Sequence, residues 1–148
     1  MRSIVKFIIA LASVFSLTAA LAADSPQEQR HELMEHVGDA AKAVGQMLKG
    51  EQPFDAATAM ESFNTWHEAA GKFGDLFPEG TETGYDTRAK AAIWTDREGF
   101  DSALQAFSDA VDAAIAAAPQ DLDALNAAAG PVFKKCKACH EDYRVEED

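Results

Sequence analysis

The stretch Cys136-Lys137-Ala138-Cys139-His140 lies near the C-terminal end of the sequence and carries its most specific chemical signal. Two cysteines separated by two residues and followed directly by a histidine form the attachment pattern of c-type haem. Each thiol can add to one vinyl group of the porphyrin, and the histidine nitrogen can then ligate the iron. On a helix the three side chains would share one face, because they stand at i, i+3 and i+4. The motif therefore predicts one covalently bound haem c with its iron.

Other interpretations of the two cysteines are a disulfide, half of a zinc site or a thioredoxin-like redox motif. A structural zinc site takes four ligands, commonly from two such pairs, and the chain has only two cysteines. A thioredoxin-like motif is expected beside a βαβ pattern, and the sequence shows none. Haem attachment is the favoured interpretation, and a disulfide is the alternative.

The N-terminal residues 1–22 have the pattern of a secretory signal peptide. Arg2 and Lys6 precede a short apolar run, and Ala20-Leu21-Ala22 supplies the small residues of a cleavage site. An uncleaved anchor is the alternative, but the run is short for a membrane span of about 20 residues. We expect cleavage near Ala23, export to the periplasm if the source is bacterial, and no membrane insertion of the mature domain, residues 23–148.

The chain is strongly acidic, with a formal net charge of −12, and removal of residues 1–22 makes it −14. Nucleic acid and anionic membrane surfaces are therefore poor partners. A basic redox protein would be attracted, although the charge could also serve solubility alone. The mature length fits one domain, and the abundance of Ala, Glu, Asp and Leu favours helices.

Apolar spacing and capping residues predict four helices and an all-α fold. The first opens at Ser25-Pro26 and stops at Gly50, and the second extends from about Asp55 to Gly74. Residues 75–88 are expected to form a long irregular connection. The third helix begins with a capping box formed by Thr95 and Glu98 and is closed by Pro119. The fourth begins near Asp121.

The apolar faces of these helices suggest how they pack. The inner face of the second helix is predicted to contain Ala56, Met60, Phe63, His67, Ala70 and Phe73, and that of the fourth Leu122, Leu125, Ala129, Val132, Phe133, Cys136, Cys139, His140 and Tyr143. Phe77, Tyr85 and Trp94 should fasten the connection to the bundle, and Pro131 should kink the last helix. The resulting fold is an antiparallel four-helix bundle with haem on its C-terminal helix.

Four sequence elements, in this order, resemble the class II c-type cytochromes, which comprise cytochrome c′ and its low-spin relatives. They are Arg30-His31-Glu32-Leu33-Met34, Lys49-Gly50 with Pro53-Phe54-Asp55-Ala56-Ala57, Ile93-Trp94, and Cys136 to Arg144. The resemblance covers the whole mature chain, and the last element is the most specific.

The resemblance implies a role for each site residue. Cys136 and Cys139 would form the thioethers, and His140 would be the proximal iron ligand. Arg30 would lie near a haem propionate, and Arg144 beside the proximal histidine. Met34 would face the iron on the distal side, where the small residues Gly38, Ala41 and Gly45 leave room for a flat ring.

Two functions follow from the two branches of this family. The first is an electron carrier in which His140 and Met34 both ligate the iron. The alternative is a five-coordinate cytochrome c′ that binds nitric oxide or carbon monoxide, with Met34 crowding the iron without bonding it. We predict no enzyme, because the sequence shows no nucleophile–base pair and no catalytic carboxylate cluster.

The remaining polar and small residues suggest partners. Lys134, Lys135 and Lys137 either complement the dipole of the last helix or mark a docking surface for a redox partner. Family members often dimerise through the first two helices, and Ala40, Ala43 and Gly45 would permit close approach. His31, His36 and His67 are interpreted as surface or core histidines, and Met47 and Met60 as core.

Overall fold

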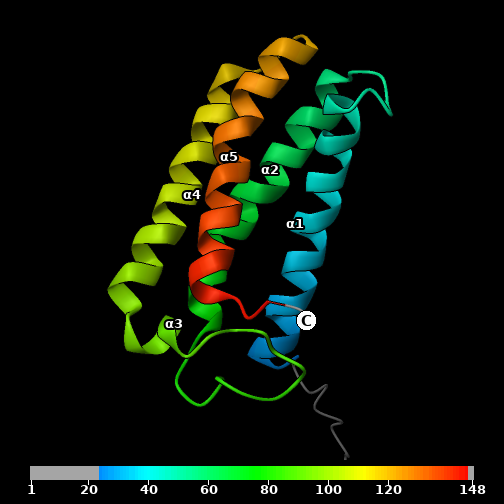
Figure 1. Ribbon diagram of the computed structural model, residues 1–148. Coiled ribbons are helices and arrows are strands. Elements are labelled where there is room, and N and C mark those ends of the chain that lie inside the picture. Colours follow the sequence, from blue (N-terminus) through cyan, green and yellow to red (C-terminus); the bar gives the residue numbers. More distant parts are fainter. Residues whose placement is uncertain (1–23, 147–148) are drawn as a thin grey trace, which may run out of the picture.

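The fold is an antiparallel bundle of four long helices, seen in a computed structural model that describes residues 24–146 (Figure 1). The long helices are α1 (Pro26–Leu48), α2 (Ala56–Phe73), α4 (Arg97–Ala117) and α5 (Leu122–Tyr143). Two short elements, η1 (Gly74–Leu76) and α3 (Ala92–Thr95), interrupt the long connection between α2 and α4. The predicted fold class is confirmed, and the predicted signal peptide lies outside the described residues.

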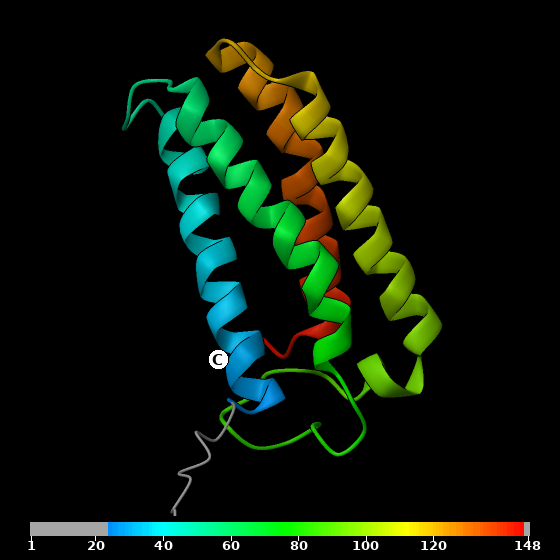
Figure 2. The ribbon, with the colours of Figure 1, turned by 180° about the vertical axis from the view of Figure 1, so that it is seen from behind.

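The long connection covers one end of the bundle. Viewed from behind, it crosses beneath α1 and α2 at the end where α5 also finishes (Figure 2). Residues from three separate parts of the sequence therefore meet at this end: the start of α1, the end of α5 and the connection itself.

Three of the four long helices start at the predicted positions, and each has a capping side chain there. Ser25 and Glu28 form a capping box ahead of α1, with Pro26 at the first helical position. Asp55 accepts a hydrogen bond from the Thr58 backbone at 2.7 Å, and Asp121 accepts one from the Ala124 backbone at 2.8 Å. Each cap satisfies a backbone N–H that has no partner inside its helix.

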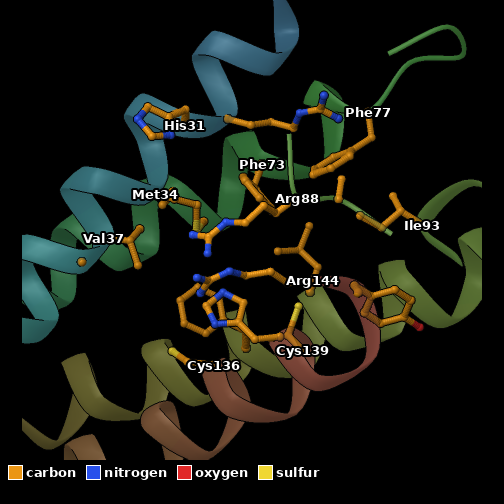
Figure 3. A pocket seen from close by; sticks show the side chains of 18 of the residues that line it. His31, Met34, Val37, Phe73, Phe77, Arg88, Ile93, Cys136, Cys139 and Arg144 are labelled. Atoms are coloured by element: carbon orange, nitrogen blue, oxygen red, sulfur yellow. The ribbon is translucent and has the colours of Figure 1, made fainter. Parts of the chain in front are cut away.

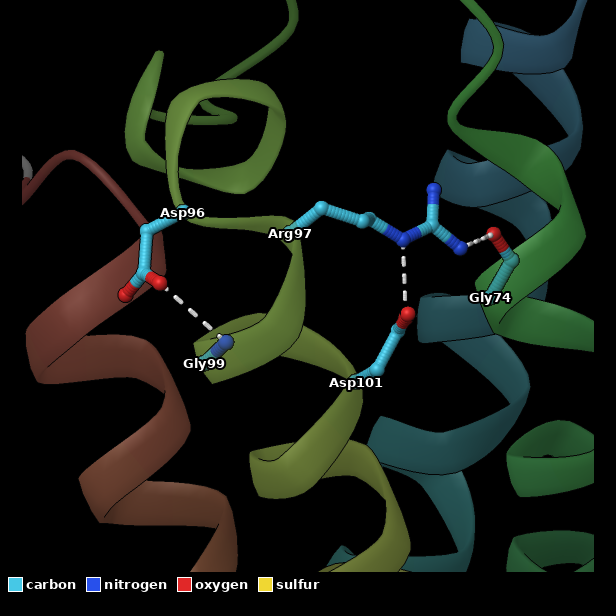
Figure 4. A network of polar contacts seen from close by, with 5 residues as sticks. All are labelled: Gly74, Asp96, Arg97, Gly99 and Asp101. Carbon is cyan, nitrogen blue, oxygen red and sulfur yellow. Dashed lines mark hydrogen bonds and ion pairs between the residues drawn. The ribbon is translucent and has the colours of Figure 1, made fainter.

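The predicted Thr95–Glu98 capping box of the third long helix is wrong by one residue. The N-cap of α4 is Asp96, whose Oδ1 accepts a hydrogen bond from the Gly99 backbone at 3.2 Å (Figure 4). Thr95 belongs to α3, and its hydroxyl donates to the Ala91 carbonyl at 3.3 Å. Because α3 uses Thr95 as its last residue, the chain turns one position later, where aspartate is an equally good cap.

Arg97 then connects the start of α4 to the end of α2. Its Nη2 donates to the Gly74 carbonyl at 3.0 Å, and its Nε donates to Asp101 at 2.8 Å (Figure 4). The first contact holds together two segments that are 23 residues apart in the sequence.

Trp66 is the central residue of the main core and has no solvent exposure. Its indole Nε1 donates to the Val37 carbonyl of α1 at 3.1 Å, and its ring meets Phe133 of α5 edge-on at 5.6 Å between centroids. The prediction that His67 faces inward is wrong: His67 is exposed and pairs with Asp112 at 2.8 Å. One helical position rotates a side chain by about 100°, and burying the larger indole surface stabilises the bundle more.

A second core cluster supports the end of the bundle where α5 finishes. Phe77 meets Phe100 at 4.9 Å between centroids, and Phe100 meets Tyr143 at 5.4 Å. Trp94 contacts Phe77 at 5.6 Å, so these two aromatics fasten the connection as predicted. Tyr85 is 54% exposed, and its ring meets His31 of α1 edge-on at 6.0 Å between centroids, so it makes a third, more exposed contact with the bundle.

Two further predictions about helix faces are corrected. Leu122 is exposed at the first position of α5, although Leu125, Ala129 and Val132 form the expected buried stripe. Ala40 packs in the main core, as its place on the apolar face of the first helix predicts, and it is therefore buried and does not offer the dimer contact suggested for it. The helix α5 continues through Pro131 to Tyr143.

Among the described residues, none of the helices has the length and apolar character that crossing a bilayer requires.

The tight packing at Gly99 gives a stability prediction. A Cβ on Gly99 would overlap the Asp96 carboxylate and lie 2.7 Å from the Tyr143 hydroxyl oxygen. We expect Gly99→Ala to lower the free energy of unfolding by about 1–3 kcal/mol, the usual cost of overpacking, in urea titrations of the holoprotein.

Gly71 provides the matched control for this variant. It is an exposed glycine in α2, and a Cβ there would meet no atom within 4 Å. Gly71→Ala should raise the free energy of unfolding by about 0.5–1 kcal/mol, because alanine loses less backbone entropy in a helix. Equal effects of the two substitutions would contradict the packing argument.

Candidate functional site

A cavity of about 450 Å³ opens at the end of the bundle where α5 finishes. Its volume lies in the range of small-molecule and cofactor sites. Its walls are largely apolar and come from all four long helices and the connection: Val37, Ala41, Ala69, Ala70, Phe73, Phe77, Ile93, Phe100, Leu104, Phe107 and Phe133. Such a wall favours a flat apolar occupant.

One wall of the cavity is the last part of α5. Cys136, Cys139 and His140 all line the cavity, and both sulfur atoms point into it (Figure 3). The helix brings them to one face, as their spacing predicts. Each cysteine is a half-buried free thiol, with no disulfide to another of the described residues. Burial raises the pKa of Cys136 to about 11 and also raises the pKa of Cys139, so both are neutral thiols near pH 7.

His140 is held in the form that binds a metal. Partial desolvation of its ring lowers its pKa, and the positive charges of Arg144 and Arg88 lower it further. Neutral imidazole is therefore favoured near neutral pH, and this form has the lone pair that an iron ligand needs.

The opposite wall is the first half of α1. Met34 reaches into the cavity from α1 and faces the two cysteines of α5 across it (Figure 3). Gly38 and Ala41 line the cavity beside it, as expected for residues that leave room for a ring, whereas Gly45 does not. His31 lines the rim on the same helix, and His36 and His67 are absent from the lining.

Arg30 is a buried cation at the mouth of the cavity. Its side chain is 5% exposed, and its guanidinium lies 4.6 Å from the centroid of Phe77 and 5.7 Å from that of Trp94. Burial lowers its pKa, and the charge of Glu82 partly offsets this effect. Its Nη2 donates to the Thr81 carbonyl at 2.7 Å.

Two of the hydrogen-bond donors of Arg30 are buried without an acceptor in the described residues. Within the described residues, no hydrogen-bond acceptor reaches its buried Nε or Nη1. A buried donor without a partner costs about 1–3 kcal/mol, and more when it is charged. An anionic group on the cavity's occupant would remove this cost, which is what a haem carboxylate supplies.

The rim of the cavity is positive although the protein is acidic. Among the described residues, four Lys or Arg side chains and only two Asp or Glu side chains line the cavity, namely Arg30, Arg88, Lys135, Arg144, Glu35 and Asp86. The whole chain has 25 acidic and 13 basic residues. Apolar walls, a cationic rim, paired thiols and a neutral histidine together fit a haem with two propionates.

Arg88 is one of several cavity residues that the sequence analysis does not predict. It lies in the connection that was expected to be irregular, and no local motif marks it. The structure brings it to the site because the Val145 backbone donates to the Arg88 carbonyl at 2.8 Å, next to a bridge between Ala89 and Arg144.

Fold and site together define a c-type cytochrome built on a four-helix bundle. Residues 25–144 match the family model for cytochrome c′. The chain is 31% identical over 144 residues to a cytochrome c-556 of Rhodopseudomonas palustris, covering 95% of this chain and 96% of the relative.

The solved structures of similar proteins also belong to cytochromes c′. The structure of cytochrome c′ from Rhodopseudomonas palustris has a TM-score of 0.81 and 33% identity, covering 85% of this chain and all of the other. A nitric oxide complex of a mutant cytochrome c prime from Alcaligenes xylosoxidans has a TM-score of 0.66 and 33% identity. The match covers 82% of this chain and 98% of the other.

The protein belongs to the cytochrome c′ family, and the predicted resemblance to class II c-type cytochromes is confirmed. The cofactor of this family is a covalently attached haem c with its iron, as the attachment motif predicts.

The attachment site can be tested by removing its two thiols. In the double variant Cys136→Ala, Cys139→Ala, no cysteine remains in the chain. We expect denaturing mass spectrometry to find the wild-type polypeptide with the mass of one haem added and the variant without it. Each single variant should keep the haem through its remaining thioether. Haem that stays covalently bound to the double variant would contradict this assignment.

Proposed function

We propose that the protein is a monohaem electron carrier in which His140 and Met34 ligate the iron from opposite faces. The observation that supports this proposal most is the position of Met34, which faces the attachment turn of α5 across the cavity (Figure 3). When bound, the haem supplies a one-electron couple between ferrous and ferric iron. The coarser function, a haem protein that transfers electrons or binds a gas, belongs to the family as a whole.

Two side chains, Met34 and Arg30, would both raise the reduction potential of this couple. A thioether ligand from Met34 favours ferrous iron and raises the reduction potential. The buried positive charge of Arg30 at the cavity mouth acts in the same direction, because it opposes the extra positive charge of ferric iron. The packed aromatic rings of Phe77, Phe100 and Tyr143 line the cavity and hold its walls in place.

Gas binding is the second candidate function. The relative from Alcaligenes xylosoxidans, whose structure holds nitric oxide, supports it. In that case Met34 would occupy space on the distal side of the iron without bonding it. Nitric oxide or carbon monoxide would then compete with its side chain for the same space.

Location and partners complete the proposal. We propose export to the periplasm, where the net charge of −14 would attract a basic redox protein. We also propose a homodimer through α1 and α2, since Ala43 and Gly45 are only partly buried. We propose no enzymatic activity.

Two substitutions at Met34 separate the two functions. Met34→Leu removes the sulfur and keeps the apolar bulk, whereas Met34→Ala removes both. If Met34 is a ligand, both variants should lose the low-spin absorption spectrum and the methionine–iron band of the wild-type protein. If Met34 only occupies space, Met34→Leu should resemble the wild type. Met34→Ala should then bind carbon monoxide at least about tenfold faster, a change of about 1.4 kcal/mol in the barrier.

Met60→Leu is the control for the loss of a methionine. Met60 lies in α2, packs against the main core and does not line the cavity. The absorption spectrum of Met60→Leu should equal that of the wild-type protein. A high-spin wild-type spectrum near neutral pH would exclude methionine ligation and favour the gas-binding function.

Export has a separate test. When the gene is expressed with its own N-terminus in a host that attaches haem c, the intact mass should correspond to a chain beginning near Ala23. Ala22→Asp should leave residues 1–22 attached, because the cleavage site needs small residues. A full-length wild-type product in the periplasmic fraction would contradict a cleaved signal peptide.

A further inference from the structure

Three lysines lie on the outer side of α5, around the turn that carries the haem-attachment motif. Lys134, Lys135 and Lys137 are neighbours of Cys136 in the sequence, and all three are exposed. Figure 1 shows this part of α5 at the near side of the bundle, and Figure 2, from the opposite side, shows it behind α2. The three residues, here called the lysine group, therefore face solvent on the helix that holds the cysteines.

The lysine group is a positive region of a strongly acidic protein. The chain has 25 acidic and 13 basic residues, yet residues 124–140 include no Asp or Glu. Lys134 and Lys135 form no ion pair with any of the described residues, and Lys137 pairs with Glu141 at 3.5 Å. The side chains of that pair are 76% and 57% exposed, so water screens their attraction. The local charge outside the attachment turn is therefore positive.

The dipole of α5 does not account for the lysine group. The helix ends at Tyr143, and a positive charge stabilises the dipole only within the last turn. His140 is the basic residue of that turn, whereas the lysine group precedes it. Glu141 and Asp142 also lie in the last turn, where negative charge is unfavourable. The charges of this part of α5 are therefore not arranged for helix stability.

The lysine group lies next to the bonds that would hold the haem. Lys135 and Lys137 flank Cys136 in the sequence, and Lys135 also lines the cavity. A thioether at Cys136 joins the porphyrin directly to this turn of α5. A protein that contacts the outside of the turn is then only a few covalent bonds from the haem. Because electron transfer slows steeply with distance, this surface offers a short path between the haem and a second redox centre.

We propose that the lysine group is the docking surface for a redox protein whose contact face is acidic. This inference rests on the proposed electron-carrier function and specifies the local chemistry of its partner. Carboxylates of the partner would meet the lysine group, orient the encounter and hold the second redox centre beside the attachment turn. The rest of the partner's surface is neutral or basic, because a net charge of −14 would repel a uniformly acidic protein.

The test uses two inorganic oxidants of opposite charge, ferricyanide, a trianion, and tris(phenanthroline)cobalt(III), a trication. Each takes one electron from the ferrous holoprotein, and stopped-flow absorbance gives the second-order rate constant. If ferricyanide reacts beside the lysine group, its rate constant should fall when salt is raised from about 10 mM to about 200 mM, because salt screens the attraction. If the net charge of −14 controls the reaction, this rate constant should rise instead.

The decisive variant combines Lys134→Gln, Lys135→Gln and Lys137→Gln. Its ferricyanide reaction should be at least about fivefold slower than that of the wild type at low salt, and its cobalt reaction at least about fivefold faster. A changed midpoint potential would move both rate constants in the same direction, so opposite shifts report the local charge. Lys134→Gln alone should give smaller shifts of the same signs, which keeps the test valid if the triple variant fails to bind haem.

The matched control combines Lys42→Gln, Lys49→Gln and Lys72→Gln. It removes the same total charge from exposed lysines on or beside α1 and α2, and none of the three lines the cavity. Each of its rate constants should change by less than a third of the change in the triple variant of the lysine group. Circular dichroism and the haem absorption spectrum of each variant would establish that the bundle is folded and loaded.

Poly-L-glutamate provides a model of an acidic protein surface. It should bind the lysine group and slow the ferricyanide reaction of the wild-type protein and of the control variant. The triple variant of the lysine group should be insensitive to it. Equal sensitivity of the two triple variants would show that the lysine group does not select acidic surfaces and would overturn the proposal.

These measurements also separate the docking surface from the ligation of the iron. A ferricyanide rate constant that rises with salt, or equal rate changes in the two triple variants, would overturn the docking proposal. If that result came with a low-spin wild-type spectrum, Met34 ligation would stand. A high-spin wild-type spectrum together with the expected rate changes would reject Met34 ligation and retain the docking surface.

Discussion

The structure depends on one constraint: α1 and α5 must stay apart at one end of the bundle while remaining joined in the middle. α1 packs mainly on α2, and α5 packs mainly on α4. Trp66 links α1, α2 and α5 through its indole hydrogen bond and ring contacts. Beyond this point the helices separate around the cavity of about 450 Å³. Its walls are largely apolar, so an occupant that removes them from water would stabilise this end of the bundle.

The positive charge at the cavity mouth matches the occupant that the separated helices leave room for. An apolar macrocycle with carboxylate edges needs apolar walls and a cationic mouth, and both are present in a chain with a net charge of −12. The cost of burying Arg30 is reduced by the faces of Phe77 and Trp94 and by the Thr81 carbonyl. The same aromatic rings form the second core cluster, so packing and electrostatics at this end of the bundle share their residues.

The differences between sequence and structure have local physical causes. The pattern of apolar residues located all four long helices, the predicted starts at Asp55 and Asp121 were correct, and so was the predicted cap at Ser25. The cap of α4 moved to Asp96 because α3, a helix of four residues, was too short to be visible as a periodic pattern. On α2, His67 and Trp66 differ by one position, and periodicity alone does not decide which of two neighbours faces inward. That choice depends on the size of the space between α1 and α5.

The sequence by itself determined the cofactor chemistry and the helical framework, because both are written in residues close together in the chain. The spacing of Cys136, Cys139 and His140 is a property of a single helix turn. The family resemblance placed Arg30 and Met34 at the site, but tertiary structure alone decided which parts of the long connection join them. Arg30 and Thr81 are 51 residues apart, and Arg88 reaches the cavity only through backbone pairing with the segment after α5. Such contacts depend on how whole helices pack and on the path of an irregular connection, and no local pattern in the sequence encodes either.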